Sequence, residues 1–227
     1  MTRFKELCLD VHGDPAVLGE FWSAVTGVPY VRGPGPGEPG DLVGDVEGMG
    51  IALCPVPEVK TVKNRVHLDV HTDSVDTLLA LGASLAPGYD NAEDAWTVLL
   101  DPEGGELCAF VRDEVPAYKV YELTVDSADA EQNARWWADV LGGTYGEKDQ
   151  DEAWVERIPG APFDCIVFGT VPEPKTVKNR IHWDVRTDDL ALLTDAGATV
   201  LTTQPRWTVM ADPEGNEFCA FLPDRGD

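Results

Sequence analysis

The sequence predicts an α+β protein built from four βαβββ modules that pair into two domains. The first observation behind this fold class is an internal repeat: PEVKTVKNRVHLDV at 57–70 recurs as PEPKTVKNRIHWDV at 172–185, identical at 11 of 14 positions. A second block, WTVLLDPEGGELCAF at 96–110, recurs as WTVMADPEGNEFCAF at 207–221. Chance does not place two such blocks in the same order, so the chain is a duplication. We place the domains at 1–113 and 118–225, joined where RDEVPAYK loses its periodicity.

Each copy divides again by its hydrophobic pattern. In the first copy, FKELCLDV alternates as a strand does, and Asp14-Pro15 then supplies an N-cap with proline at the first helical position. Apolar residues follow at helical spacing until Gly27. After a Gly/Pro loop, the remaining runs predict strands at 41–46 and 50–56.

The same order then returns within that copy and twice in the second copy. The expected elements are a strand at 65–70, a helix at 74–81, a hairpin of 96–100 with 106–111, a strand at 121–125, a helix at 129–141, a strand at 180–185, a helix ending at 196 and a hairpin turning at 212–215. A sheet this small leaves one face bare, so each module needs a partner. Pairing two modules also creates a cleft, where a ligand is expected.

Composition narrows the possible partners. With 41 acidic and 17 basic residues, the formal charge is -24, which argues against a nucleic-acid or anionic-membrane partner and favours a cationic small molecule. The alternative is that the strongly acidic surface only keeps the protein soluble. We find no apolar run of membrane-spanning length and no signal-peptide pattern, so we expect a cytoplasmic protein, monomeric or homodimeric. The five cysteines form no CxxC pair and are expected to be reduced thiols.

These motifs resemble the glyoxalase-like branch of the vicinal oxygen chelate superfamily, which includes glyoxalase I, extradiol dioxygenases and bleomycin-resistance proteins. The resemblance is carried by the strand–helix opening with its Asp-Pro cap, the RVHLDV and RIHWDV strands, and the DPEG hairpins. It covers nearly the whole chain, once per copy. It implies the fold, and leaves the activity to be argued from the site.

In catalytic relatives, the resemblance implies a divalent metal held mostly by His and Glu from the first and last strands of paired modules. Only His67 and His182 fit that pattern here, because Cys108 and Cys219 stand where the family has glutamate. Iron-dependent extradiol chemistry is therefore disfavoured. We favour no metal cofactor, with zinc, nickel, manganese or iron as the alternative. For zinc, the set Cys8, Cys54, His67 and Cys108 would suit tetrahedral coordination if the four converge, although cysteines on interior strands are more often small apolar fillers.

The other candidate residues are polar or aromatic positions on the same strand faces. His67 and His182 are the candidate catalytic groups, each oriented by an aspartate two residues later; the alternative is that these pairs hold two modules in register. The candidate ligand-binding residues are Asp10, Asp69, Trp96, Cys108, Asp126, Asp184, Trp207 and Cys219.

The KTVKNR stretch is the most basic part of this acidic chain. It either aims Asn64 and Arg65 at an anionic group or anchors the crossover between modules by pairing with acidic neighbours. Only the first copy has a longer loop at 83–95, which contains NAED. Two functions remain: metal-free binding of a small aromatic or cationic molecule, as in bleomycin-resistance proteins, and a metal-dependent or histidine-assisted lyase or isomerase of the glyoxalase type acting on a small metabolite.

Overall fold

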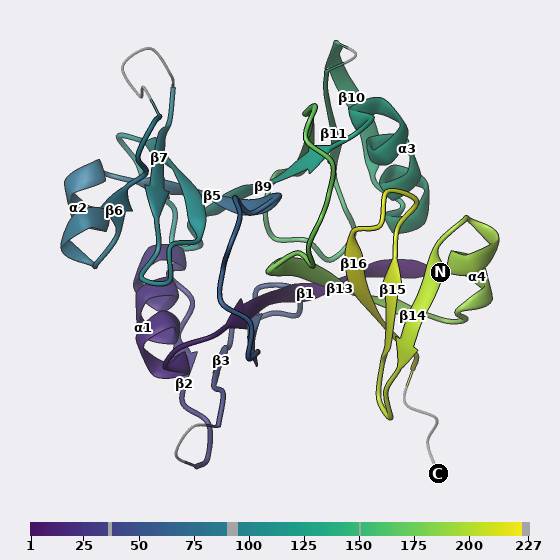
Figure 1. The fold of residues 1–227 in the computed structure, drawn as a ribbon, viewed down its shortest axis with the longest axis horizontal. Helices are drawn as coiled ribbons and strands as arrows, with labels where there is room; N and C mark the ends of the chain where they lie inside the picture. Colours follow the sequence, from purple (N-terminus) through teal and green to yellow (C-terminus); the bar gives the residue numbers. More distant parts are fainter. Residues whose placement is uncertain (36–37, 90–94, 150, 224–227) are drawn as a thin grey trace.

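The computed structural model describes residues 1–35, 38–89, 95–149 and 151–223. Over these residues the chain forms four modules, each a strand, a helix and a strand set that returns to pair beside the first strand (Figure 1). Modules 1 and 2 belong to the first half of the chain, and modules 3 and 4 to the second. None of the helices in this part is long and apolar enough to cross a membrane.

The elements of the first half follow the expected order. Module 1 consists of β1 (Thr2–Val11), α1 (Pro15–Thr26), β2 (Tyr30–Val31), β3 (Asp41–Leu42) and β4 (Ile51–Pro55). Module 2 consists of β5 (Val66–Thr72), α2 (Val75–Ala80), β6 (Ser84–Leu85), β7 (Thr97–Leu100) and β8 (Glu106–Val111). The NAED segment of the longer loop, at 91–94, lies outside the described residues.

The second half repeats this plan with longer edge strands. Module 3 consists of β9 (Val120–Ser127), α3 (Ala130–Leu141), β10 (Thr144–Asp149), β11 (Glu152–Glu156) and β12 (Cys165–Thr170). Module 4 consists of β13 (Ile181–Thr187), α4 (Ala191–Asp195), β14 (Thr199–Thr203), β15 (Thr208–Ala211) and β16 (Glu217–Phe221).

The first helix of each half begins and ends as the sequence predicts. The Asp14 side chain accepts a hydrogen bond from the Ala16 amide, and Pro15 occupies the first turn. Gly27 then ends α1 in the left-handed conformation, with φ of 78°. Apolar faces of α1 and α3 bury Trp22 and Trp137 completely. Both helices therefore serve the core.

The two sheets exchange modules between the halves of the chain. Sheet A has the order β14-β15-β16-β13-β1-β4-β3-β2, and sheet B the order β10-β11-β12-β9-β5-β8-β7-β6. Module 1 thus pairs with module 4 through the antiparallel strands β1 and β13, and module 2 pairs with module 3 through β5 and β9. Each sheet therefore takes one module from each half of the chain, whereas the sequence pattern groups the two modules of each copy together.

One continuous apolar core joins the two sheets. Phe4 of sheet A and Phe163 of module 3 make an edge-to-face contact at 5.2 Å between ring centroids. The remaining polar side chains of the inner strands lie on the opposite face of each sheet, because successive strand residues alternate sides. That alternation assigns the apolar set to the core and the His, Asp and Cys set to the opposite face of each sheet.

The DPEG turns fasten each sheet to the other. Glu103, in the β7–β8 turn of sheet B, accepts hydrogen bonds from the backbone amides of His12 and Gly13 in the β1–α1 loop, at 3.0 and 2.8 Å. Glu214, in the β15–β16 turn of sheet A, does the same for Ala128 and Asp129 ahead of α3, at 3.0 and 2.8 Å. The repeated glutamate is therefore a structural clamp between sheets.

Candidate functional site

The central strands of each sheet bring a histidine, an aspartate and a cysteine together. The ligand atoms of His67, Asp69 and Cys108 all lie within 4.8 Å of one another in sheet B. In sheet A, those of His182, Asp184 and Cys219 do the same. The register explains both groups: β5 places Asp69 beside Cys108 of β8, and β13 places Asp184 beside Cys219 of β16. All six side chains are buried.

The residues opposite each histidine come from the other half of the chain. Cys8 of β1 is the register partner of His182, and Thr124 of β9 is the partner of His67. Cys54 lies on β4, next to β1, whereas its counterpart in sheet B is Gly169. The set Cys8, Cys54, His67 and Cys108 is therefore divided between two sheets and does not form one cluster. Instead, three of the five cysteines gather in sheet A around His182.

In sheet B the polar groups bond mainly to one another. His67 Nδ1 lies 2.8 Å from Asp69 Oδ1, and Thr124 Oγ1 donates to Asp69 Oδ2 at 3.0 Å. Burial alone lowers the pKa of His67, but the charge and hydrogen bond of the adjacent Asp69 outweigh it and raise the pKa to about 10. At neutral pH this histidine is an imidazolium paired with a carboxylate.

In sheet A the equivalent histidine is neutral. Burial, and then the nearby Lys178 ammonium, lower the pKa of His182 to about 3. His182 Nε2 lies 3.5 Å from Cys219 Sγ and 3.7 Å from Asp184 Oδ1. Burial also raises the pKa of Asp184 to about 6, against the opposing charge of Lys5. Two homologous histidines thus carry different charges because their surroundings differ.

The acids and thiols near the two histidines also have shifted pKa values, and these groups differ between the two sheets. The Cys54 thiol and then burial raise the pKa of Cys8 well above its usual value. In sheet B, burial and then the Asp69 charge raise the pKa of Glu122 to about 7, and Cys165 Sγ lies 3.3 Å from Glu122 Oε2. The strand pattern of the sequence gives no signal for Glu122, because its pKa shift depends on packing against β5 and β12.

Aromatic side chains lie beside both polar groups. Trp96 stacks on Phe110 in sheet B, with ring centroids 5.8 Å apart and an interplanar angle of 29°, and Trp207 stacks on Phe221 in sheet A at 6.0 Å and 26°. Each phenylalanine follows the cleft cysteine by two residues and so shares its strand face. Both phenylalanines were missing from the sequence prediction, although the repeated CAF motif would have indicated them.

The sheet B pair belongs to a larger aromatic group. Tyr121 meets Phe110 at 5.1 Å and His71 at 4.6 Å between ring centroids, and the Arg112 guanidinium lies 5.3 Å from the Phe110 ring. Trp96 is 39% exposed. The indole therefore offers a flat surface that solvent, or a ligand, can reach.

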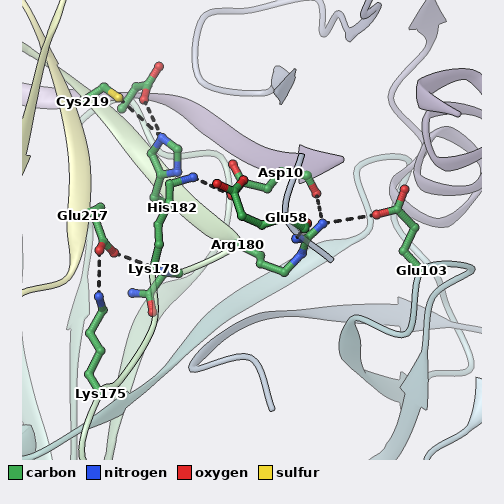
Figure 2. Close-up of polar contacts among 11 residues, drawn as sticks. Asp10, Glu58, Glu103, Lys175, Lys178, Arg180, His182, Glu217 and Cys219 are labelled. Carbon is green, nitrogen blue, oxygen red and sulfur yellow. Dashed lines mark hydrogen bonds and ion pairs between the residues drawn. The ribbon is translucent and has the colours of Figure 1, made fainter. Parts of the chain in front are cut away.

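A cavity of about 1040 Å³ lies between the two KTVKNR crossovers. Asp10 of sheet A and Asp126 of sheet B both line it, so these two predicted ligand-binding residues meet at this cavity. Lys178 pairs with Asp10, and Lys63 pairs with Asp126 at 2.6 Å. The Lys178 ammonium lies between Asp10 and the His182 ring (Figure 2).

The crossover residues make the anchoring contacts that one of the two expectations for KTVKNR predicts. Arg65 donates to the backbone carbonyls of Glu173 and Asp126 at 2.7 and 2.8 Å. The backbone N–H of Asn64 donates to Glu106 Oε2 at 3.0 Å, and Lys60 pairs with the same carboxylate at 2.8 Å. In the second copy, Lys175 pairs with Glu217, and Arg180 with Glu103 (Figure 2). These contacts anchor the repeated basic segment, whose residues also line the cavity.

The sequence and the fold now identify the class of protein. The sequence model of the Glyoxalase-like domain family matches the chain twice, at residues 6–110 and 122–221. The chain therefore belongs to the glyoxalase-like family, as a tandem two-domain member of the vicinal oxygen chelate superfamily. No curated protein sequence matches it.

Solved structures show the same fold at low sequence identity. Glyoxalase I from Zea mays superposes with a TM-score of 0.72 at 14% identity, covering 98% of this chain and 92% of that one. A putative dioxygenase from Bacillus subtilis gives 0.62 at 14% identity, covering 99% and 86%. The cppA protein from Streptococcus pneumoniae gives 0.50 at 12% identity, covering 98% and 100%. These similarities concern the fold alone.

Proposed function

We propose that this protein binds a small aromatic or cationic molecule on the sheet faces that carry the Trp–Phe stacks and the His–Asp–Cys groups. The observation that carries the proposal is the Trp–Phe stack beside a buried His–Asp–Cys group, present in both sheets. A flat indole offers an aromatic ligand stacking worth about 0.5–1.5 kcal/mol beyond area burial. Buried polar groups beside it supply orientation, as is usual in ligand sites.

Charge supports the cationic part of this proposal beside the His–Asp–Cys groups only. Asp184 and Glu122 are carboxyl groups there, with pKa values of about 6 and 7 set mainly by burial. A bound cation favours their ionised forms. The cavity between the crossovers is different, because the aspartates lining it are each paired with a lysine.

Tryptophan fluorescence tests the proposal. The full chain is titrated with a panel of planar aromatic amines and their uncharged analogues, alongside Trp96→Leu, Trp207→Leu and the control Trp136→Phe. Trp136 donates its indole N–H to the Ala196 carbonyl on the outside of α3 and lies in neither cleft. We expect saturable quenching, with affinity reduced about 3- to 10-fold by loss of the stacking indole.

Equal affinity in the wild type and both leucine variants would exclude the stacking site. Absence of saturable binding by every compound in the panel would exclude the proposed function. A preference for uncharged analogues would remove its cationic part.

A second function, a lyase or isomerase of the glyoxalase type, is favoured by the two groups of candidate metal ligands. The family's usual His and Glu set does not fit here, because cysteines occupy the glutamate positions. As a metal-free acid–base pair, the histidines are also poorly matched to neutral pH, since their pKa values of about 10 and 3 lie far from it. Turnover that disappears in both His67→Gln and His182→Gln would favour this second function.

A further inference from the structure

The cavity between the two KTVKNR crossovers is separate from the sheet faces that carry the aromatic stacks. Its volume of about 1040 Å³ is close to the upper end of the range for small-molecule sites, roughly 300–1,000 Å³. Among the described residues, its lining includes no member of either His–Asp–Cys group and neither Trp96 nor Trp207. A ligand bound there would therefore occupy a different site.

The two crossovers hold each other in place around this cavity. Arg65 of the first crossover donates to the Glu173 carbonyl of the second at 2.7 Å. Arg180 of the second donates to the Glu58 carbonyl of the first at 2.8 Å. The two bonds join equivalent positions of the repeat, so the cavity has matched walls. Because these walls are already fixed, little conformational freedom is lost when a ligand binds.

The cavity is basic although the protein is strongly acidic. Nine of its lining residues are Lys, Arg, Asp or Glu, and five of these nine are basic, whereas the whole chain has 17 basic and 41 acidic residues. The five basic residues are Lys60, Lys63, Arg65, Lys178 and Arg180. A concave surface lined by cations attracts anions. An anion that the rest of the surface repels is therefore attracted here.

Two lysines, one from each copy of the repeat, are the cations that a ligand can reach. The side chains of Lys63 and Lys178 are 44% and 51% exposed. Their partners Asp126 and Asp10 are only 13% and 4% exposed, and Figure 2 shows Lys178 with Asp10. Since a lysine ammonium can donate to more than one acceptor at once, each can bind an anion while it stays paired with its aspartate.

The rest of the lining is largely apolar and aliphatic. Val59, Val62 and Val177 line the cavity and are 57%, 44% and 45% exposed, and Pro57 and Pro174 lie beside them in the lining. Among the described lining residues none is aromatic, so the cavity offers no stacking surface. Covering exposed valines favours a ligand with an aliphatic body.

We propose that this cavity binds a small aliphatic carboxylate, and that a dicarboxylate bridges Lys63 and Lys178. The two lysines are equivalent in the repeat, so each half of the cavity supplies one ammonium. A molecule with a carboxylate at each end makes a charge-assisted hydrogen bond to both. The proposal goes beyond the aromatic or cationic ligand of the sheet faces and does not depend on it.

Isothermal titration calorimetry of the full chain measures this binding. The probes are succinate, adipate, suberate and sebacate, with octanoate as the monoanion and octanediol as the uncharged analogue. We expect one dicarboxylate molecule to bind per chain, at least one dicarboxylate to bind more tightly than octanoate, and octanediol not to bind. The affinity should fall as the salt concentration rises, because exposed charges are screened.

Variants locate the site. Lys63→Gln and Lys178→Gln should each weaken dicarboxylate binding about 5- to 20-fold. Lys148→Gln is the control, because it removes only an exposed ion pair outside the cavity. If a lysine variant fails to fold, Val177→Glu adds a negative charge to the cavity and should abolish binding. Its control is Val17→Glu, which changes an equally exposed valine on α1.

The opposite results overturn the proposal. They are an absence of saturable binding by every carboxylate, equal affinity for octanediol, or unchanged dicarboxylate affinity in both lysine variants or in Val177→Glu. Equal affinity for octanoate and the dicarboxylates overturns the bridge between the two lysines. Trp96→Leu and Trp207→Leu should bind the dicarboxylate as the wild type does. Failure of this titration therefore leaves the proposed function standing, and the reverse also holds.

Discussion

The homologous histidines His67 and His182 show how strongly the surroundings of a side chain determine its pKa. His67 and His182 occupy the same place in the repeat, each two residues before an aspartate. His67 reaches its aspartate at 2.8 Å, while His182 Nε2 stands 3.7 Å from its own. This difference of contact gives their pKa values opposite directions. The sequence shows both His–Asp pairs, but it does not show that the pKa values of the two histidines shift in opposite directions.

His182 should lower stability in acid. Its pKa is about 3 in the folded chain because of burial and Lys178, whereas an unfolded histidine titrates near 6.5, so protons bind the unfolded chain preferentially. The stability it contributes is present above about pH 6.5 and is lost as the pH falls toward 3. We expect His182→Gln to reduce this loss by up to roughly 4 kcal/mol.

Urea unfolding at several pH values between 7 and 4 measures this effect as the difference between wild type and variant. The raised pKa of Asp184, about 6, works in the other direction, since its contribution is largest in acid and is lost as the pH rises through 6. The contribution of Asp184 is present in both the wild type and His182→Gln, so it largely cancels in the difference between them. Parallel pH dependences would show that His182 titrates normally in the folded state.

At the scale of elements, the left-handed ends of α1 and α3 provide a matched pair. Gly27 and Gly142 both have positive φ, 78° and 69°. A Cβ on Gly27 would lie 2.1 Å from the Ala117 carbonyl oxygen, whereas one on Gly142 would meet nothing within 4 Å. Gly142→Ala should cost about 1 kcal/mol through backbone strain alone. Gly27→Ala should cost clearly more, because the segment joining the halves must also shift.

Thermal and urea unfolding of the two variants check this expectation. Equal destabilisation would mean that the contact between α1 and the joining segment contributes nothing. The sequence predicts the C-cap at Gly27 from glycine at the end of a helical pattern. It cannot predict the close approach of Ala117, because that contact depends on how the halves pack.

The glutamate of each DPEG turn also holds two elements together. Glu214 accepts from two backbone amides ahead of α3 and from the Ser127 hydroxyl at 2.8 Å. We expect Glu214→Ala to lower the free energy of unfolding by about 2–4 kcal/mol, since charge-assisted hydrogen bonds to a partly buried loop are lost. Glu20→Ala is the control, because Glu20 makes only an exposed ion pair with Arg32. If Glu214→Ala lowers the free energy of unfolding no more than Glu20→Ala does, Glu214 does not act as a clamp between the sheets.

For the whole molecule, the sequence predicts four modules but not their pairing. The alternating pattern of β1 is satisfied equally by a neighbour from either half, so periodicity carries no information on which module lies beside it. The structure pairs β1 with β13 and β5 with β9. For this reason Cys8 and Cys54, which the sequence groups with His67, lie in sheet A with His182, while Cys108 does lie beside His67.

Exchange of modules means that neither half should fold alone as a monomer. Residues 1–113 contain β1 and β5 without the strands that pair with them across each sheet centre. We expect the separate fragment to dimerise or aggregate, because unpaired inner strands expose backbone groups and apolar surface. Coexpression with 118–225 should restore a 1:1 complex, measured by size-exclusion chromatography with light scattering. A folded monomer of 1–113 would contradict the observed pairing.

The central claim is that the homologous histidines His67 and His182 differ in charge. It is tested most directly by nitrogen-detected NMR of the histidine side chains in metal-stripped protein. His67→Gln and His182→Gln assign the two imidazoles. The account predicts that His67 keeps both imidazole protons up to about pH 8, while His182 stays singly protonated down to about pH 5. Two histidines titrating together near pH 6.5, or in the reverse order, would contradict it.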